Sequence, residues 1–112
     1  MNKIYLKEQL GVLNKYPTEV IKSISETLDI LNENYGENRE VDKELGGYVL
    51  VIENIEDVEE LKSGMLKDIL PEYTDEIVCS EGVNYTSSLC LLSSDFSVVV
   101  ISDEELSKFL LD

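Results

Sequence analysis

Alternating β-rich runs and polar turns dominate the second half of the chain. The most apolar part is residues 85–101, where two β-rich runs, 85–92 and 96–101, flank the polar turn Ser93-Ser94-Asp95. This pattern is typical of a β-hairpin, and we expect the hairpin to form the centre of a sheet. Residues 48–53 are nearly all apolar, which predicts a strand buried on both faces, and residues 76–79 predict a further strand.

The clearest helical pattern covers residues 17–34. Its apolar residues recur at the spacing of one helix face and are Ile21, Ile24, Leu28, Leu31 and Tyr35. Thr18 stands at the expected N-cap position, and Gly36 follows the last apolar turn as the residue that ends the helix. The opposite face is charged, so this helix is expected to cover one side of a core.

Three shorter helices are also expected. Residues 4–13 have apolar positions at helical spacing and precede the break at Tyr16-Pro17. Residues 55–63 follow Asn54, which is a favourable N-cap with Asp57 in the first turn. The last helix is predicted to begin at Ser102, which forms a capping box with Glu105 three residues later.

These elements define the fold class. Their order is helix, helix, strand, helix, strand, strand, strand, helix, and three consecutive strands joined by short turns pair antiparallel. We therefore predict one α+β domain over residues 1–112, with a helical N-terminal part (1–36) and a sheet-containing part (46–112). Its single sheet has about four strands, mostly antiparallel, with the helices packed on one face.

Charge is the strongest compositional feature. The 112 residues include 24 Asp and Glu against 9 Lys and Arg, which gives a formal net charge of −15. Such a surface repels phosphate backbones and anionic lipid headgroups, so direct binding of nucleic acid or of a membrane is not expected. A basic protein or a cation is a better partner, although solubility alone would also explain the charge.

The chain has no histidine, which limits the chemistry it can perform. Ser-His-Asp and Cys-His catalysis are excluded within the chain, and a zinc site would need an unusual ligand set. The polar row Tyr85, Thr86, Ser87 and Ser88 could line a small pocket, but an exposed strand face is the expectation. We therefore predict no enzymatic activity, no cofactor and no metal.

The cysteines and the terminal residues bear on the compartment. Cys79 and Cys90 lie in predicted strands at a spacing that matches no metal or redox motif, so buried thiols in a reducing compartment are expected. The first residues are interrupted by charge too early for a signal peptide, and no apolar run is long enough to span a membrane. A cytoplasmic location is therefore expected.

Two groups of acidic residues are candidates for partner binding. The denser group comprises Glu53, Glu56, Asp57, Glu59 and Glu60. Carboxylates are favoured at a helix start, so capping explains two or three of them and the others are left for a binding face. The second group lies in the polar segment 37–45 and comprises Glu37, Glu40, Asp42 and Glu44. A calcium loop is not expected there, because the alternating ligands and the central glycine are missing.

Three stretches carry a resemblance to other proteins. They are Gly46-Gly47-Tyr-Val-Leu-Val-Ile-Glu with the Glu-Asp-Val-Glu-Glu-Leu helix after it, Leu70-Pro71-Glu72-Tyr73, and Tyr85-Thr-Ser-Ser-Leu-Cys-Leu-Leu-Ser-Ser-Asp-Phe. Together they resemble small uncharacterised proteins carried by phages and mobile elements of Firmicutes, over about residues 46–101. The resemblance implies an inhibitor of host defence, since anti-CRISPR proteins are similar in size and charge and several present carboxylates where a nuclease expects phosphates.

The leading expectation is a protein-binding inhibitor of the anti-CRISPR or antirestriction type, which occludes a basic surface of a nuclease or nucleoprotein effector. An immunity protein against a basic toxin nuclease would use the same electrostatics. A structural or assembly protein of a phage or mobile element is a third possibility, and a small enzyme or ligand-binding domain around residues 85–88 is a fourth. The oligomeric state is left open by the sequence.

Overall fold

The computed structural model describes residues 2–36, 47–64, 74–80, 82–91 and 97–111. The described strands are β1 (Asn2–Ile4), β2 (Tyr48–Val51), β3 (Thr74–Ser80), β4 (Val83–Leu91) and β5 (Ser97–Asp103). The described helices are the 3-10 helix η1 (Lys7–Leu13) and the α-helices α1 (Thr18–Tyr35), α2 (Ile55–Ser63) and α3 (Glu104–Leu111). The α+β class is therefore confirmed.

The described strands form one five-stranded sheet in the order β1-β2-β5-β4-β3. β3, β4 and β5 pair antiparallel in sequence order, as predicted for strands joined by short turns. β2, however, pairs in parallel with β5, with Val49 beside Val99 and Val51 beside Ile101, and β1 adds an antiparallel edge to β2. Antiparallel pairs thus predominate among the described strands, as expected, but the detail differs: five strands are described instead of about four, and the pair β2–β5 makes the sheet mixed.

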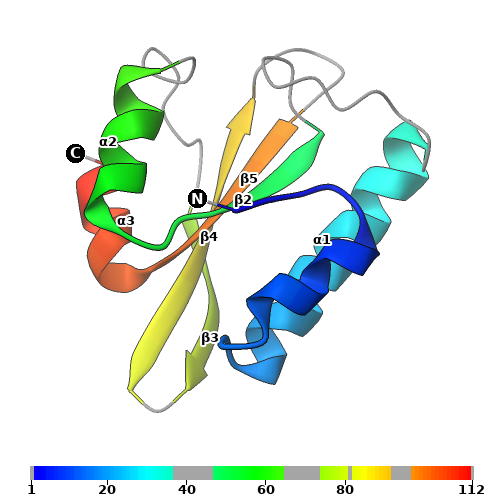
Figure 1. Cartoon of the computed structure of the whole chain (residues 1–112), viewed down its shortest axis with the longest axis horizontal. Helices are drawn as coiled ribbons and strands as arrows, with labels where there is room; N and C mark the ends of the chain where they lie inside the picture. Colours follow the sequence, from blue (N-terminus) through cyan, green and yellow to red (C-terminus); the bar gives the residue numbers. More distant parts are fainter. Residues whose placement is uncertain (1, 37–46, 65–73, 81, 92–96, 112) are drawn as a thin grey trace.

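Helices cover both faces of this sheet, not one face as predicted. α1 and η1 lie on one side, and α2 and α3 lie on the other (Figure 1). The reason is the apolar composition of β2 and β5, two adjacent strands in the interior of the sheet. Along β2, Val49 and Val51 face α1, while Tyr48 and Leu50 face α2 and α3. Since successive side chains of a strand point to opposite faces, the nearly all-apolar run predicted as buried on both faces requires two helical layers.

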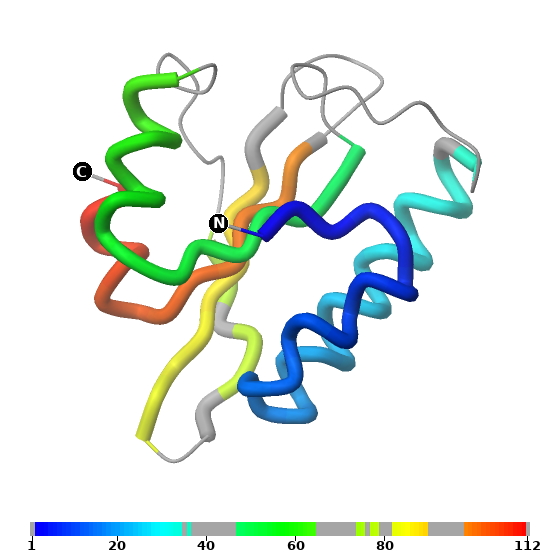
Figure 2. Tube along the Cα trace, viewed as in Figure 1, coloured from blue at the N-terminus to red at the C-terminus, as the bar shows by residue number. Residues whose placement is uncertain are grey.

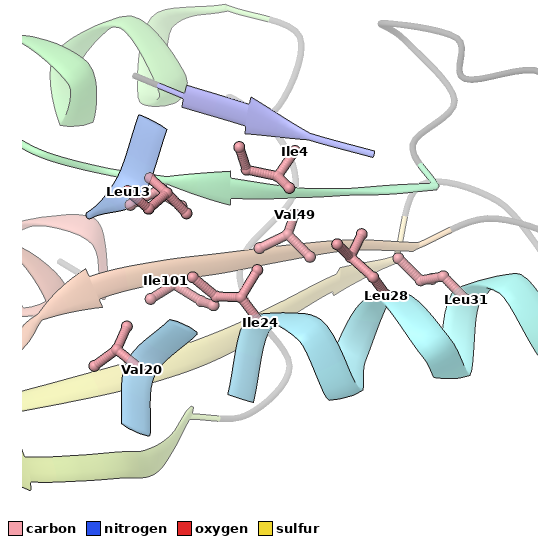
Figure 3. Packing of buried hydrophobic residues seen from close by; sticks show 9 residues of the cluster. Ile4, Leu13, Val20, Ile24, Leu28, Leu31, Val49 and Ile101 are labelled. Atoms are coloured by element: carbon pink, nitrogen blue, oxygen red, sulfur yellow. The ribbon is translucent and has the colours of Figure 1, made fainter. Parts of the chain in front are cut away.

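The α1 layer contains three residues of the predicted apolar stripe, Ile24, Leu28 and Leu31, together with Val20, which the sequence pattern did not include. Ile21 is only partly buried, and the side chain of Tyr35 lies outside the described part of the structure. Val20, Ile24, Leu28 and Leu31 point from α1 toward Val49 and Ile101 of the sheet, with Ile4 and Leu13 beside them (Figure 3). All of these side chains are buried. Thr18 is the first helical residue and not the N-cap, which is Pro17 with an extended backbone (φ −55°, ψ 148°). Proline suits this boundary because its φ is already near the helical value.

The predicted helix at residues 4–13 is wrong over residues 4–6, and the rest of it is a 3-10 helix. Asn2–Ile4 form a strand instead, in which Ile4 pairs with Val49 of β2 and is buried. The Gln9 side-chain oxygen then accepts hydrogen bonds of 2.9 Å from the backbone N–H groups of Tyr5 and Leu6, so that helical structure begins only at Lys7. The N-terminal part therefore contributes a strand to the sheet before the chain crosses to the α1 side (Figure 2).

The two helices of the other layer begin at polar caps. α2 begins as predicted, with the Asn54 side chain accepting a hydrogen bond of 2.9 Å from the backbone N–H of Asp57. α3 is capped by Asp103, whose Oδ1 accepts a hydrogen bond of 2.8 Å from the backbone N–H of Leu106. The predicted cap, Ser102, is instead the penultimate residue of β5 and is buried. Within the described residues, no helix has the length and apolar character needed to cross a membrane.

Candidate functional site

The five acids of the denser predicted group have different environments. Glu56, Glu59 and Glu60 are exposed on α2, whereas Asp57 is only 6% exposed and Glu53 is partly buried. The sequence did not separate these two kinds, because burial depends on how α2 lies against the sheet. The group therefore divides into three surface carboxylates and two that take part in the fold.

Asp57 serves the turn between β2 and α2. Its Oδ2 accepts a hydrogen bond of 2.9 Å from the backbone N–H of Glu53, and its own N–H donates to Asn54. Burial raises the pKa of the Asp57 carboxyl, but backbone N–H groups of Glu53 and Asn54 are among the groups that lower it, and the net pKa is below its usual value. This agrees with the capping interpretation of part of the acidic group.

Glu53 is held by side chains from the N-terminal part of the chain. Asn2 donates from Nδ2 to its Oε1 at 2.5 Å, and the ammonium group of Lys15 pairs with its Oε2. The Tyr16 hydroxyl is a further hydrogen-bond partner of the same carboxylate. Glu53 therefore ties the segment before α1 to the end of β2.

Five of the exposed acids lie on α2 and α3, which pack side by side as the outer layer on one side of the sheet (Figure 1), and other exposed acids lie on α1 on the opposite side. We call the surface on α2 and α3 the acidic helix face, and it comprises Glu56, Glu59, Glu60, Glu104 and Glu105, all of them exposed. Two lysines lie on the same helices, and one of them, Lys62, donates from Nζ to the backbone oxygen of Phe109 at 3.0 Å. Of the predicted residues, Glu37, Glu40, Asp42 and Glu44 lie outside the described part of the chain.

A hollow of about 500 Å³ continues this face at the start of α3. It is lined by Gly82, Val83, Asn84, Asp103, Glu104, Glu105 and Lys108. Asn84 donates from Nδ2 to Glu104 at 2.7 Å, while its Oδ1 is buried and has no hydrogen-bond partner among the described residues. Three of the lining side chains are carboxylates, so the hollow extends the negative surface from the helices to the β3–β4 hairpin.

A second, smaller hollow lies where the parallel strands β2 and β5 end. It has a volume of about 220 Å³ and is lined by Lys15, Tyr16, Ile52, Glu53, Tyr85 and Asp103. We call it the tyrosine crevice. Its carboxylates occupy equivalent positions, because Glu53 and Asp103 each follow the paired residues Val51 and Ile101 by two positions. Crevices outside the carboxyl ends of parallel strands are common ligand sites in mixed and parallel sheets.

The two tyrosines of the crevice contact each other edge to face. Their ring centroids are 5.8 Å apart and the ring planes meet at 73°. Burial raises the pKa of the Tyr16 hydroxyl well above its usual value, and the negative charges of Glu53 and Asp103 raise it further. The Lys15 ammonium group lies 5.5 Å from the centroid of the Tyr16 ring. The crevice is therefore a negative site with aromatic walls and one internal cation.

The polar row at residues 85–88 is not the exposed strand face that the sequence predicts. Thr86 and Ser88 are buried and Tyr85 lines the tyrosine crevice. Thr86 reaches the hydroxyl of Ser107 of α3 at 2.5 Å, and Ser102 reaches the same hydroxyl at 2.5 Å. Because α3 covers this side of the sheet, these hydroxyls bond to one another and not to solvent.

Sequence reasoning did not identify Lys15, Tyr16 and Asp103 as site residues. The available signal was weak: Glu53 and Asp103 are each the first acid after an apolar strand, but they become neighbours only through the parallel pairing of β2 with β5. The side chains of Cys79 and Cys90 lie outside the described part of the structure. Among the residues that are described, no group of three potential metal ligands is close enough to hold a metal ion.

Comparisons with protein-family models, with curated proteins and with solved structures found no match for this chain. The functional argument therefore depends on the two surfaces described above, the acidic helix face and the tyrosine crevice.

Proposed function

We propose that the protein acts by binding a basic protein surface through its acidic helix face, as an inhibitor and without catalysis. The observation that carries this proposal is the placement of five exposed glutamates on two adjacent helices of one layer. Glu56, Glu59 and Glu60 make no side-chain hydrogen bond or ion pair with other described residues. Their charge is therefore available to a partner, and a net charge of −15 adds long-range attraction to any basic surface.

The chemistry of the face favours a target that normally holds nucleic acid. A groove that binds phosphates is lined by lysine and arginine, and a surface of carboxylates competes for the same positive charges. The proposed target is accordingly a nuclease or nucleoprotein effector of a host defence system, of the kind inhibited by anti-CRISPR or antirestriction proteins. An immunity protein bound to a toxin nuclease would present the same face, and the identity of the captured enzyme separates the two.

The first experiment identifies the partner. The tagged protein is used to capture binding proteins from host lysate, with and without added nuclease, and the captured proteins are read by mass spectrometry. Recovery of one basic nucleic-acid-binding enzyme under both conditions supports the proposal. Recovery only in the absence of nuclease means that nucleic acid bridges the two proteins, and this would contradict direct binding.

The second experiment tests the face itself. The variant Glu56→Gln/Glu59→Gln/Glu60→Gln is compared with Glu19→Gln/Glu26→Gln/Glu33→Gln, which removes the same charge from exposed positions of α1 on the opposite side of the sheet. We expect the α2 variant to lower the association rate with the captured enzyme by about tenfold at low salt, and the α1 variant to change it far less. Equal effects of the two variants on the association rate would mean that net charge alone drives binding. No effect of the α2 variant would mean that the acidic helix face takes no part in binding.

Glu53 and Asp57 are left out of the test variant on purpose. Replacing all five predicted acids would disturb the turn between β2 and α2, where Asp57 caps the helix and Glu53 binds Asn2 and Lys15. A loss of binding would then have two explanations. The triple variant removes only side chains that have no other role among the described residues.

A further inference from the structure

The tyrosine crevice contains none of the five glutamates of the acidic helix face, although Asp103 lines both the crevice and the hollow that continues that face. Its walls come from the segment before α1, from the ends of β2 and β5, and from Tyr85 of β4. Ile52 and Ile101 continue the parallel ladder up to its edge, with the Ile52 N–H donating to the Ile101 oxygen at 2.8 Å. Glu53 and Asp103 therefore emerge side by side from the two most buried strands. A site on such rigid strands keeps its geometry when a ligand binds.

The charge of the crevice selects the sign of a ligand. Two carboxylates, Glu53 and Asp103, face one ammonium group, Lys15, so the site carries a net negative charge. An anion would meet repulsion there, whereas a cation is attracted both by the carboxylates and by the rings of Tyr16 and Tyr85. The volume of about 220 Å³ is small compared with that of common ligand pockets, and suits a single small group.

The position of Lys15 indicates that the crevice accommodates an ammonium group. The ammonium group of Lys15 pairs with Glu53 and lies near the Tyr16 ring, although its side chain is 62% exposed. An exposed ion pair of this kind contributes little, because the flexible lysine is ordered at a cost and water screens the charges. An external cation can therefore take the place of Lys15 at the crevice without disturbing the fold.

We propose that the tyrosine crevice binds an organic monocation, an alkylammonium or guanidinium group, between Tyr16, Tyr85, Glu53 and Asp103, and that Lys15 is an internal competitor for this position. The group belongs either to a free amine or to a lysine or arginine side chain of a protein. The second source rests on the proposed function, since it would anchor the basic partner at a point beside the acidic helix face. Binding of the free group does not depend on that function.

The test measures binding of n-butylguanidinium and n-butylammonium to the purified protein by two-dimensional NMR, with n-butylurea as the neutral analogue. We expect saturable shifts of the backbone signals of Glu53, Asp103 and Tyr85 with the two cations and none with the urea. Lys15→Met should tighten cation binding about 1.4- to 5-fold, the range expected for displacing an exposed ion pair. The matched control Lys22→Met, which removes the same charge from the exposed face of α1, should leave the affinity unchanged.

A second pair of variants tests the carboxylates. Asp103→Asn should weaken cation binding at least about threefold, because one of two carboxylates is lost. Asparagine is also a good N-cap, so α3 is retained, and thermal unfolding verifies this. Glu105→Gln, two residues away on the exposed face of α3, is the matched control and should have no effect. Equal binding of urea and cation, equal tightening by both lysine variants, or no saturable shift would each overturn the proposal.

The source of the cation is then separated by competition. If the group is a side chain of the basic partner, butylguanidinium releases that partner in proportion to its occupancy of the crevice, while butylurea does not. If the affinity for the partner is unchanged at saturating butylguanidinium, no side chain of the partner occupies the crevice, and a free amine is the remaining source. If the protein binds the cations but captures no partner, the proposal for the crevice stands and the proposed inhibitor function is overturned. The two proposals can therefore fail separately.

Discussion

The Asp57 carboxylate accepts a hydrogen bond of 2.9 Å from the backbone N–H of Glu53, so one residue of the predicted acidic group fixes the backbone of another. Between them, Asn54 accepts a hydrogen bond of 2.9 Å from the Asp57 N–H. The first bond satisfies the N–H of the residue before the N-cap, and the second satisfies a first-turn N–H that has no partner within the helix. Neighbouring acids in the sequence thus differ in role, because some stabilise the turn and others are exposed to solvent.

Replacing Asp57 should lower stability more than replacing its exposed neighbour. Asp57→Ala removes a buried acceptor from the Glu53 N–H and is expected to lower the free energy of unfolding by about 1–3 kcal/mol. Glu56→Ala, one position earlier and exposed, should change it by less than about 0.5 kcal/mol. Urea unfolding followed by circular dichroism measures both values. Equal effects of the two variants would show that the turn does not depend on Asp57.

The same residue gives the protein a sensitivity to acid. The pKa of Asp57 is lowered in the folded state, so its stabilising contribution is complete above its pKa in the unfolded chain, about 3.9, and is lost as the pH falls through the lower folded value. We expect the unfolding free energy of the wild type to fall more steeply below about pH 4 than that of Asp57→Asn. Urea unfolding series between neutral and acid pH compare the slopes, and identical slopes would contradict the assignment.

Glu53 should prove to be structural, and most of its contribution should not come from Lys15. The carboxylate has a partly buried amide partner in Asn2 and a hydroxyl partner in Tyr16, whereas Lys15 is largely exposed. Glu53→Ala is therefore expected to cost about 1–3 kcal/mol of unfolding free energy, and Lys15→Met less than about 1 kcal/mol. A double-mutant cycle measures the coupling between the two. A coupling as large as the whole effect of Glu53→Ala would assign the stabilisation to the ion pair.

Tyr16 should make the protein sensitive to alkali. Its folded pKa lies above the usual value of about 10, so its contribution is complete below that pH and is lost as the pH rises toward the folded value. The wild type should therefore lose unfolding free energy above about pH 10 more steeply than Tyr16→Phe. A slope for Tyr16→Phe as steep as that of the wild type would point to general charge repulsion instead.

The elements that depend on local patterns could be predicted from the sequence. Most of the apolar stripe of α1, the Asn54 cap of α2 and the pairing of the consecutive strands β3, β4 and β5 follow from patterns within one short segment of the sequence. The parallel pairing of β2 with β5 joins residues about fifty positions apart and has no local signal. Without it, the second helical layer and the buried position of Thr86 and Ser88 could not be foreseen.

The candidate surfaces differ in the same way. The exposure of Glu56, Glu59 and Glu60 could be predicted, because an amphipathic helix shows its outer face in the sequence. The tyrosine crevice could not be predicted, because Tyr16, Glu53 and Asp103 meet only through contacts between three distant segments. The Ser102 cap failed for a related reason: β5 extends to Asp103, so the strand buries the serine and the next residue caps the helix.

The buried hydroxyls under α3 should behave as one unit. Ser107 bonds to both Thr86 and Ser102, so Ser107→Ala leaves two buried hydroxyls without this partner and is expected to cost about 1–3 kcal/mol of unfolding free energy. Thr86→Val removes one member and keeps the Ser102–Ser107 contact, so its cost should be smaller. The double variant should cost less than the sum, since residues that share a partner are not additive.

Ser63→Ala is the matched control for this cluster, because the Ser63 hydroxyl also bonds to a neighbour, the Glu59 backbone oxygen at 2.8 Å, but at an exposed position. Water replaces that bond when the hydroxyl is removed, so the cost should stay below about 0.5 kcal/mol. Urea unfolding measures all four variants under one condition. A cost for Ser107→Ala no larger than that for Ser63→Ala would mean that the cluster adds nothing to the attachment of α3, and additive values for Thr86→Val and Ser107→Ala would mean that the three hydroxyls act independently.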